Sequence, residues 1–163
     1  MGKEQGEKMT KASENKAPSV WPGEIPIQSF YTAGSGGQIF FTALKRDGKL
    51  IGTPCNPCAQ VYVPARSFCE RCFSALTETV EVKRTGRLVS YTICYFDRDR
   101  RPLPRPLALA LAQLDGATTL LLHYLLGVDD PEKVEIGSKV ETIVKPRTKR
   151  VGSILDIEGF RIN

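Results

Sequence analysis

Four cysteines arranged in two pairs constrain this sequence more than any other feature. Cys55 and Cys58 form one C-x2-C pair, and Cys69 and Cys72 form a second pair ten residues later. Two residues between the thiols allow a tight turn to direct both sulfurs at one point, and two such turns complete a tetrahedral shell of four thiolates. The pattern predicts a zinc ribbon whose structural zinc ion is bound by these four residues, with no ligand position left for water.

Other uses of the paired cysteines fit the sequence less well. The surrounding residues lack the βαβ pattern of a thioredoxin-like redox site, and iron or an iron–sulfur centre is the alternative occupant of the same thiols. The total of five cysteines is odd, and no apolar signal segment precedes them, which favours metal ligation and a reducing, cytoplasmic location. We expect Cys94, within a predicted strand, to be a small buried hydrophobic side chain.

Neither cysteine pair is followed by a glycine. Ala59 and Phe73 occupy these positions, so we expect tight turns that crowd their side chains. Arg66 and Arg71 are close enough in sequence to offset the double negative charge of a zinc ion with four thiolates. They are otherwise solvated surface residues.

The composition is that of an ordinary globular protein. The chain has 163 residues, of which 41% are hydrophobic and 25% charged, and this excludes a fully disordered chain, a collagen and a disulfide scaffold. The net charge of +5 favours anionic partners, namely nucleic acid, phosphorylated cofactors or an acidic protein surface. Residues 107–127 are rich in Leu and Ala, but Asp115 and Gly116 interrupt them, so we expect no membrane span.

The N-terminal third contains three different kinds of segment. Residues 1–20 are polar and mixed in charge, which predicts a flexible tail. We interpret residues 21–50 as a docking segment and a short helix. The docking segment, which is expected to pack on its own domain or on a partner chain, carries Trp21, Ile25, Ile27, Phe30 and Tyr31. Apolar residues at helical spacing predict the helix over residues 38–47, and Gly48 is placed to end it.

After the predicted zinc ribbon, which we assign to residues 51–76 as rubredoxin-like, the pattern becomes β-like. Strands are predicted at residues 79–83, 86–95, 107–114, 117–126, 139–145 and 151–157, with an arginine-rich loop at 97–106. Asp115-Gly116 predicts a hairpin, and Asp130 before Pro131 predicts the start of a short helix. The chain is therefore mainly β, and residues 77–163 are expected to form a five-stranded OB-fold barrel.

The order of these motifs resembles the DUF35 family, the zinc-ribbon/OB-fold proteins associated with acyl-CoA enzymes. The resemblance covers about residues 38–145. Its matching segments are residues 40–50, with Phe40-Phe41; 55–72, with the cysteines; 85–92; 109–116; and 127–140. The absence of glycine after each cysteine pair is the main departure from the family pattern.

The resemblance implies a non-catalytic accessory subunit. Members of the family are similar to subunits or fused domains of thiolases, thiolase-like aldolases and MaoC-type hydratases, and they help to form the channel for the coenzyme A thioester. A thiolase-fold partner in a hetero-oligomer, with the thioester as shared ligand, is the expectation that we favour. The cysteine nucleophile would then lie on the partner, and this chain would contribute no catalytic residue.

The remaining candidate residues are contacts rather than catalysts. Arg98, Arg100, Arg101 and Arg105 are candidates for binding the phosphates of coenzyme A or a partner surface, or form a solvated face; Phe40 and Phe41 are further contact candidates. His123, the single histidine, lies in an apolar run without an orienting neighbour, so we expect a structural residue of the barrel.

Two other classes of function compete with this interpretation. Zinc ribbons and OB folds both bind nucleic acid, and the basic charge fits, but the predicted central hairpin offers Leu and Ala rather than aromatic residues for base stacking. An independent hydrolase or oxidoreductase lacks a nucleophile–base pair, a glycine-rich phosphate loop and an open metal site.

Overall fold

The computed structural model describes residues 20–23, 26–128 and 130–163, and the chain divides into two units, residues 1–31 and 32–163. In the first unit, the described residues form no helix or strand. The side chains of Trp21, Ile27, Phe30 and Tyr31 there are 72–91% exposed. The predicted docking role of this segment therefore stays a prediction. The flexible tail predicted for residues 1–20 lies outside the described residues apart from Val20, and so does Ile25.

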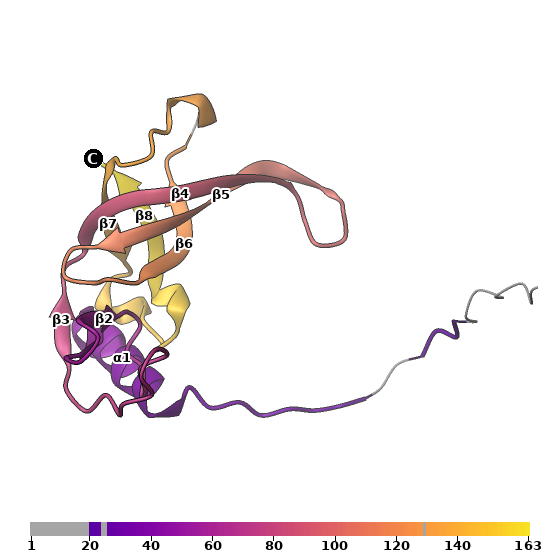
Figure 1. Ribbon diagram of the computed structural model, residues 1–163. Coiled ribbons are helices and arrows are strands. Elements are labelled where there is room, and N and C mark those ends of the chain that lie inside the picture. The colour runs from indigo at the N-terminus through magenta and orange to yellow at the C-terminus, as the bar shows by residue number, and fades with distance from the viewer. Residues whose placement is uncertain (1–19, 24–25, 129) are drawn as a thin grey trace, which may run out of the picture. The chain divides into compact units, whose positions relative to one another are not determined.

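The described residues of the second unit are mainly β with one α-helix, as predicted (Figure 1). A three-stranded sheet has the order β2-β1-β3, and five strands close into a barrel in the order β4-β5-β6-β8-β7. Among the described residues, no helix is long and apolar enough to cross a membrane. The elements are α1 (Gly34–Asp47), β1 (Leu50–Cys55), β2 (Gln60–Tyr62), β3 (Val80–Val82), β4 (Thr85–Phe96), β5 (Pro102–Leu114), β6 (Leu120–Leu126), β7 (Lys139–Val144) and β8 (Ile157–Ile162), with 3-10 turns η1 (Pro131–Lys133), η2 (Arg147–Lys149) and η3 (Ile154–Asp156).

Helix α1 begins four residues before the predicted start. Its first turn packs on the ribbon, because the Gly36 amide donates to Ser67 Oγ at 3.2 Å and a Cβ at Gly36 would lie 2.7 Å from the Ala65 carbonyl oxygen. The end at Asp47 is as predicted. Gly48 follows in the left-handed conformation, with φ 68°, and its amide donates to the Leu44 carbonyl at 3.0 Å.

The hairpin predicted at Asp115-Gly116 is confirmed as β5 and β6. The alternating Leu and Ala residues of β5 orient as a strand requires: the alanines, including Ala110 and Ala112, are buried in the barrel, and the leucines face outward. Strands β4 and β5 also extend beyond the barrel as a long hairpin (Figure 1). The predicted loop at 97–106 is therefore too long, because β5 begins at Pro102.

The last strand was predicted too early in the chain. Residues 151–157 were expected to be a strand, but they form a turn and η3, and β8 begins at Ile157. The cause is the side chain of Asp156, which is fully buried and accepts hydrogen bonds from the amides of Val151 at 2.9 Å and Gly152 at 2.7 Å. A side chain thus binds backbone groups that a strand would have offered to a neighbouring strand.

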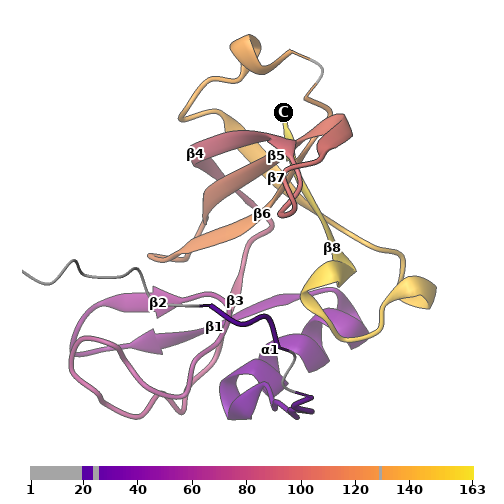
Figure 2. The same cartoon turned by 90° about the vertical axis from the view of Figure 1, so that its right-hand side faces the viewer.

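The ribbon and the barrel share one hydrophobic core. Phe40 and Leu44 of α1, Leu50 of β1, and Leu88 and Phe160 of the barrel belong to a single buried cluster. Figure 2 shows α1 and the small sheet lying together below the barrel. Strand β3 pairs with β1, although its residues lie within the range 77–163 that the sequence assigns to the OB fold.

The turn between β5 and β6 attaches the barrel directly to the ribbon. The amide of Val61 donates to Thr118 Oγ1 at 2.8 Å, and the amide of Val63 donates to Thr119 Oγ1 at 2.9 Å. The Thr118 amide in turn donates to the Val61 carbonyl at 3.0 Å. Two threonines therefore satisfy the open edge of β2, which would otherwise expose unpaired backbone groups.

We predict that Asp156→Asn destabilises the protein in a pH-dependent way. Burial raises the pKa of Asp156, but hydrogen bonds from backbone amides and the charge of Lys145 outweigh it and hold the pKa below its usual value. The carboxylate therefore stabilises the fold above its unfolded-state pKa, and this contribution is lost as the pH falls through the folded-state pKa. We expect the free energy of unfolding at pH 7 to fall by about 1–3 kcal/mol.

Urea denaturation between pH 7 and pH 3 tests this prediction. The difference between wild type and Asp156→Asn should shrink once the pH drops below about 4. Glu158→Gln, at an exposed position on β8, is the control and should change stability by less than about 0.5 kcal/mol. An equal loss at every pH would contradict a role for the charge of Asp156.

Candidate metal centre

The structure brings the four paired cysteines together. Their sulfur atoms all lie within 4.8 Å of one another, and the sulfurs of Cys55 and Cys72 are 3.6 Å apart. Tetrahedral zinc with Zn–S bonds near 2.3 Å requires sulfur–sulfur separations of about 3.8 Å. The donor set and its spacing therefore fit a zinc ion. All four positions would be filled by protein, as in structural rather than catalytic zinc sites.

Each cysteine pair lies in a tight turn at the end of the small sheet. Cys55 is the last residue of β1, and Cys58 lies in the turn that leads into β2. The second turn is closed by two backbone hydrogen bonds of 3.0 Å, from the Phe73 amide to the Cys69 carbonyl and from the Cys69 amide to the Ser74 carbonyl. The ribbon thus presents two turns to one point.

The residue after each pair adopts the left-handed conformation. Ala59 has φ 50° and Phe73 has φ 59°. Glycine tolerates this region freely, whereas a side chain costs about 1–2 kcal/mol. The turns therefore form without glycine at a cost in the backbone, whereas the predicted crowding of the side chains is not seen, because Ala59 and Phe73 are both exposed.

Hydrogen bonds favour a thiolate at the second pair. The Tyr62 hydroxyl, 3.2 Å from Cys69 Sγ, is the main cause that lowers the pKa of the Cys69 thiol to about 6, and backbone amides nearby act in the same direction. The Ser74 hydroxyl, 3.2 Å from Cys72 Sγ, lowers the pKa of Cys72. Thiolates are the form that binds a metal ion, so the protein prepares two of its ligands for a cation.

The surroundings of the first pair act in the opposite direction. The neighbouring Cys72 sulfur is the main cause that raises the pKa of Cys58 to about 12, and burial raises the pKa of Cys55. Four thiols this close cannot all ionise without a positive charge between them, because like charges oppose each other's ionisation. The cluster is therefore an electrostatic match for a divalent ion.

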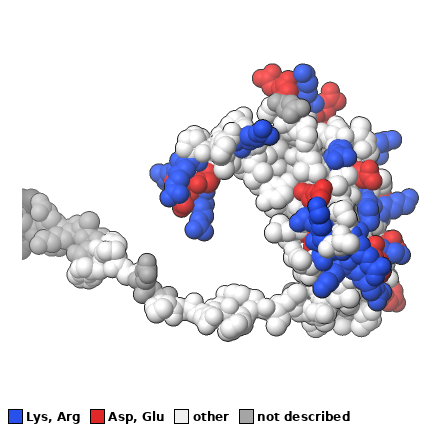
Figure 3. Space-filling view, turned by 180° about the vertical axis from the view of Figure 1, so that it is seen from behind, with Lys and Arg blue, Asp and Glu red and all other residues white. Residues whose placement is uncertain are grey.

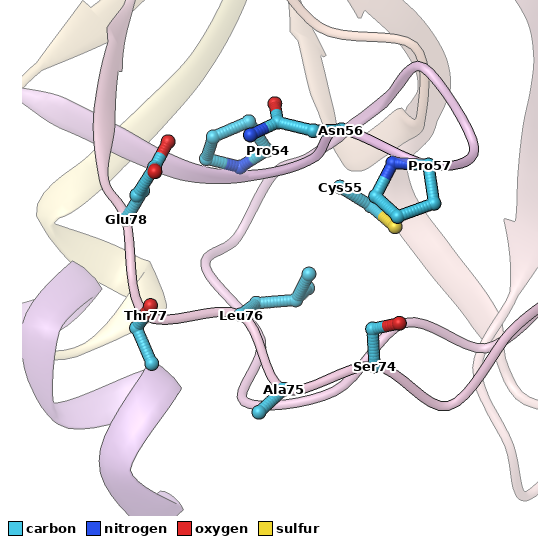
Figure 4. A pocket seen from close by; sticks show the side chains of 9 residues that line it. All are labelled: Pro54, Cys55, Asn56, Pro57, Ser74, Ala75, Leu76, Thr77 and Glu78. Carbon is cyan, nitrogen blue, oxygen red and sulfur yellow. The ribbon is translucent and has the colours of Figure 1, made fainter.

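The hollow beside the cluster is too small to be a substrate site. It has a volume of about 90 Å³, whereas ligand pockets usually measure about 300–1,000 Å³. Figure 4 shows the Cys55 sulfur and the Leu76 side chain directed into the space between residues 54–57 and residues 74–78. Cys55, Tyr62, Cys69 and Leu76 form a small buried cluster, separate from the main core.

The two arginines near the cluster have surface positions. Arg66 pairs with Glu70 at 2.7 Å, and its guanidinium lies over the Tyr62 ring at 5.0 Å from the centroid. Arg71 is exposed, and its backbone amide, rather than its side chain, donates to Cys69 Sγ at 3.4 Å. Arg66 is engaged by a carboxylate, so the groups that stabilise the thiolates are backbone amides and the hydroxyls of Tyr62 and Ser74.

The other predicted residues lie away from the cysteines. His123 is buried in the barrel, where its Nδ1 accepts from the Tyr124 amide at 2.9 Å and its Nε2 lies 3.2 Å from the Ile154 carbonyl, so both ring nitrogens are engaged. Burial lowers the pKa of His123. Cys94 is half-buried in β4 rather than fully buried as expected.

The contact candidates divide into two groups. Arg98, Arg100, Arg101 and Arg105 are exposed on the projecting β4–β5 hairpin, and their contact with coenzyme A or a partner stays a prediction. Phe40 is fully buried in the core, so this side chain has no surface to offer; its inclusion as a contact candidate was wrong because it packs between the helix, ribbon and barrel. Phe41 is partly buried against the same core.

Comparison with known proteins agrees with this architecture. Residues 42–78 match a family model described as the ChsH2 rubredoxin-like zinc ribbon domain, and residues 79–144 match the ChsH2 C-terminal OB-fold domain. A solved structure of a DUF35 family protein of unknown function from Sulfolobus solfataricus is 30% identical, with a TM-score of 0.60; the match covers 80% of this chain and 87% of that one. This chain belongs to the DUF35 family.

Two further DUF35 relatives give the family a functional context. A DUF35 domain-containing scaffold protein of Methanocaldococcus jannaschii is 29% identical over 99 residues, which are 59% of this chain and 67% of the relative. A solved structure described as the Ltp2-ChsH2(DUF35) aldolase is 27% identical, with a TM-score of 0.57. The match covers 77% of this chain and 93% of the chain in that structure. The resemblance to DUF35 proteins that the sequence indicated is therefore confirmed.

The sequence did not predict which residues surround the four paired cysteines. The role of Tyr62 depends on the ribbon bringing it to Cys69, and no spacing rule predicts this contact. Ser74 lies two residues after Cys72, which is a detectable signal, because a hydroxyl at that distance often bonds to a turn.

We predict that removing one cysteine abolishes metal binding and weakens the ribbon. Wild-type protein should contain about one zinc ion per chain, whereas Cys69→Ser and Cys55→Ser should contain far less. Both variants should also lose several kcal/mol of stability, because metal binding energy is folding energy for a lobe with so small a core. Elemental analysis and thermal unfolding measure the two effects.

Cys94→Ser is the matched control, since it removes a thiol outside the cluster. This variant should retain its zinc and unfold close to the wild-type temperature. Folded wild-type protein that contains neither zinc nor iron would refute the assignment of the metal centre.

We predict that Phe73→Gly stabilises the zinc-loaded protein by about 1 kcal/mol, because glycine relieves the left-handed backbone. Phe73 is 78% exposed, so little packing is lost. Phe68→Gly is the control: Phe68 is also exposed, at 62%, but has no positive φ, and glycine there should not stabilise. Chemical denaturation in the presence of zinc measures both, and an equal effect of the two substitutions would contradict the prediction.

Proposed function

We propose that this chain is a non-catalytic accessory subunit of an acyl-CoA-processing complex in the cytoplasm. Its partner in the hetero-oligomer is a thiolase-fold enzyme that carries out carbon–carbon cleavage or condensation of a 3-oxoacyl-CoA. Cys55, Cys58, Cys69 and Cys72 bind the structural zinc ion. The chain supports assembly and helps to form the channel for the coenzyme A thioester, which is the shared ligand.

The similarity to ChsH2 carries this proposal. Both ChsH2 domain models match in order over residues 42–144, and the ChsH2 chain belongs to a structure described as an aldolase with Ltp2. A relative described as a scaffold protein supports the same kind of role. One relative is thus a scaffold protein and the other occurs together with Ltp2 in an aldolase, and an accessory subunit is consistent with both.

The chemistry of the described residues supports a role without catalysis. Zinc would be fully coordinated by four protein thiolates and would have no position for a substrate. His123 is buried, with both ring nitrogens engaged, so it is not placed to act as a general base. Among the described residues, no second group of three or more His, Cys, Asp or Glu side chains is placed to bind a metal.

An apolar sheet face supports the proposal that the chain binds a protein partner. We call it the outer β5–β6 face; it is formed by the residues that alternate with the buried positions, and cross-strand pairs such as Leu109–Tyr124 and Leu111–Leu122 make it continuous. Its residues are Leu107, Leu109, Leu111, Leu120, Leu122 and Tyr124. A contiguous apolar patch on a folded domain is typical of a protein–protein interface.

The same face argues for a protein over a nucleic acid as partner. The second and third strands of an OB barrel commonly form the binding face for oligonucleotides, and β5 and β6 hold these positions here. Leucines dominate this face, and Tyr124 is its single aromatic residue. Stacking of bases on aromatic side chains, the usual basis of single-strand binding, is therefore poorly supported.

A thiolase-like aldolase is the second candidate partner. The solved structure described as the Ltp2-ChsH2(DUF35) aldolase favours it specifically, since a DUF35 chain occurs there in an aldolase. The accessory role, the outer β5–β6 face and the zinc ribbon are the same in both cases, and only the reaction of the partner differs. A MaoC-type hydratase partner has no such observation in its favour.

Co-purification tests the proposal. The full chain, tagged and produced at its native level, should retain a thiolase-fold protein in a fixed ratio, which mass spectrometry identifies. Thiolase and aldolase assays of the pair then distinguish the two candidates. A chain that purifies alone as a monomer and changes neither activity would overturn the proposal.

We predict that Leu122→Glu disrupts the complex without unfolding the chain. Leu122 is 57% exposed at the centre of the outer β5–β6 face, so a charge there would be buried without a partner in the interface. We expect at least a hundredfold weaker binding of the partner, measured by calorimetry or quantitative pull-down.

Ile136→Glu is the control for the exchange of an exposed aliphatic residue for a charge. Ile136 is 67% exposed and lies between η1 and β7, outside the outer β5–β6 face. Ile136→Glu should bind the partner within about threefold of wild type. Equal weakening by both substitutions would locate the interface elsewhere.

A further inference from the structure

A basic groove lies between the end of α1 and η2. It has a volume of about 470 Å³ and is lined by Thr42, Lys45, Arg46, Arg147 and Arg150. Figure 3 shows Lys and Arg side chains gathered over the lower right of that view, well apart from the arginines of the projecting hairpin. Neither the zinc ribbon nor the proposed partner face uses this groove.

The positive charge of the groove is largely uncompensated. Arg46 pairs with Asp47 at 3.1 Å, but no other lining residue has a carboxylate within ion-pair distance among the described residues. Lys45 and Arg46 lie in the last turn of α1, where the helix dipole favours cations. The dipole does not account for Arg147 and Arg150, which come from a different part of the chain and face the same groove.

Arg150 is held in place by its surroundings. Its Nε donates to the Lys145 carbonyl at 2.6 Å, and its guanidinium packs so closely on Gly48 that a Cβ there would lie 2.7 Å from Nη2. Among the described residues, neither Nη atom of Arg150 has a hydrogen-bond acceptor. A guanidinium fixed at Nε with two free terminal amino groups is preorganised for bidentate binding of an anion.

The segment that carries these arginines is also well anchored. The Lys145 amide donates to the Asp156 carbonyl at 2.8 Å, and the carboxylate of Asp156 binds the amides of Val151 and Gly152. Lys45 packs along Gly152, whose ideal Cβ would lie 3.4 Å from Lys45 Cδ. Lys45 and Arg150, one from each wall of the groove, are therefore positioned before any ligand arrives, which lowers the entropic cost of binding.

We propose that this groove binds a small oligophosphate, with diphosphate as its minimal unit. Cations on two walls fit an anion with more than one charged group, and the arginine fork matches the oxygens of a phosphate. The volume of about 470 Å³ lies within the usual range for small-ligand pockets, which favours a compact ligand. This inference does not depend on the proposed function, because the groove is complete within this chain.

Isothermal titration of the zinc-loaded full chain with inorganic pyrophosphate tests the proposal. Arg150→Lys keeps the charge but loses the fork, and Arg147→Gln removes one exposed cation; each should weaken binding about tenfold or more. Arg98→Gln, on the hairpin far from the groove, removes the same charge and should stay within about twofold. Thermal unfolding verifies that Arg150→Lys is folded, and the exposed Arg147 provides the test if it is not.

The outcomes are distinct. Absence of pyrophosphate binding to wild type, or equal weakening by all three substitutions, overturns the proposal, the second outcome because it reveals only a diffuse charge effect. Parallel titrations with ADP and with coenzyme A identify the source of the diphosphate, a free nucleotide or the nucleotide end of a larger cofactor. A positive result with pyrophosphate stands even if no thiolase-fold partner is ever found.

Discussion

The attraction between a divalent cation and four crowded thiols is the interaction on which the ribbon depends. Its own buried cluster contains only four residues, two of them cysteines, so apolar burial alone provides little stability there. The protein arranges hydrogen bonds that favour thiolates at Cys69 and Cys72, and it accepts left-handed backbone at Ala59 and Phe73 to complete the shell. Strain and charge crowding of this kind persist when a metal ion offsets them.

The folded ribbon in turn provides the contacts that attach the barrel to it. The ribbon presents the backbone of β2 to Thr118 and Thr119, and α1 and β1 contribute to the core that continues into the barrel. The turn between β5 and β6 is thereby fixed at one end, and this fixes the sheet face that these strands present. The metal centre thus acts on the proposed interface indirectly, by holding the scaffold, and needs no contact with substrate.

Local signals were readable from the sequence, and long-range ones were not. The cysteine spacing, the Asp115-Gly116 hairpin and the end of α1 at Gly48 each depend on a few neighbouring residues, and all three appear in the structure. The start of α1 depends on Ser67, more than thirty residues away, and the start of β8 depends on where the buried side chain of Asp156 finds its donors. The four cysteines were predicted as a site, but the contact of Tyr62 with Cys69 requires the folded ribbon.

The positions of apolar and basic residues on the surface distinguish a protein-binding role from an anion-binding role, which the composition alone does not. A net charge of +5 on a zinc-ribbon and OB-fold chain suggests nucleic acid binding, yet the barrel face best placed for it carries leucines. The positive charge gathers instead in a groove at the end of α1 and on the tip of the long hairpin. An apolar face that excludes water and a basic groove recognise different chemistry, so one small chain can bind a protein and an anion without competition between them.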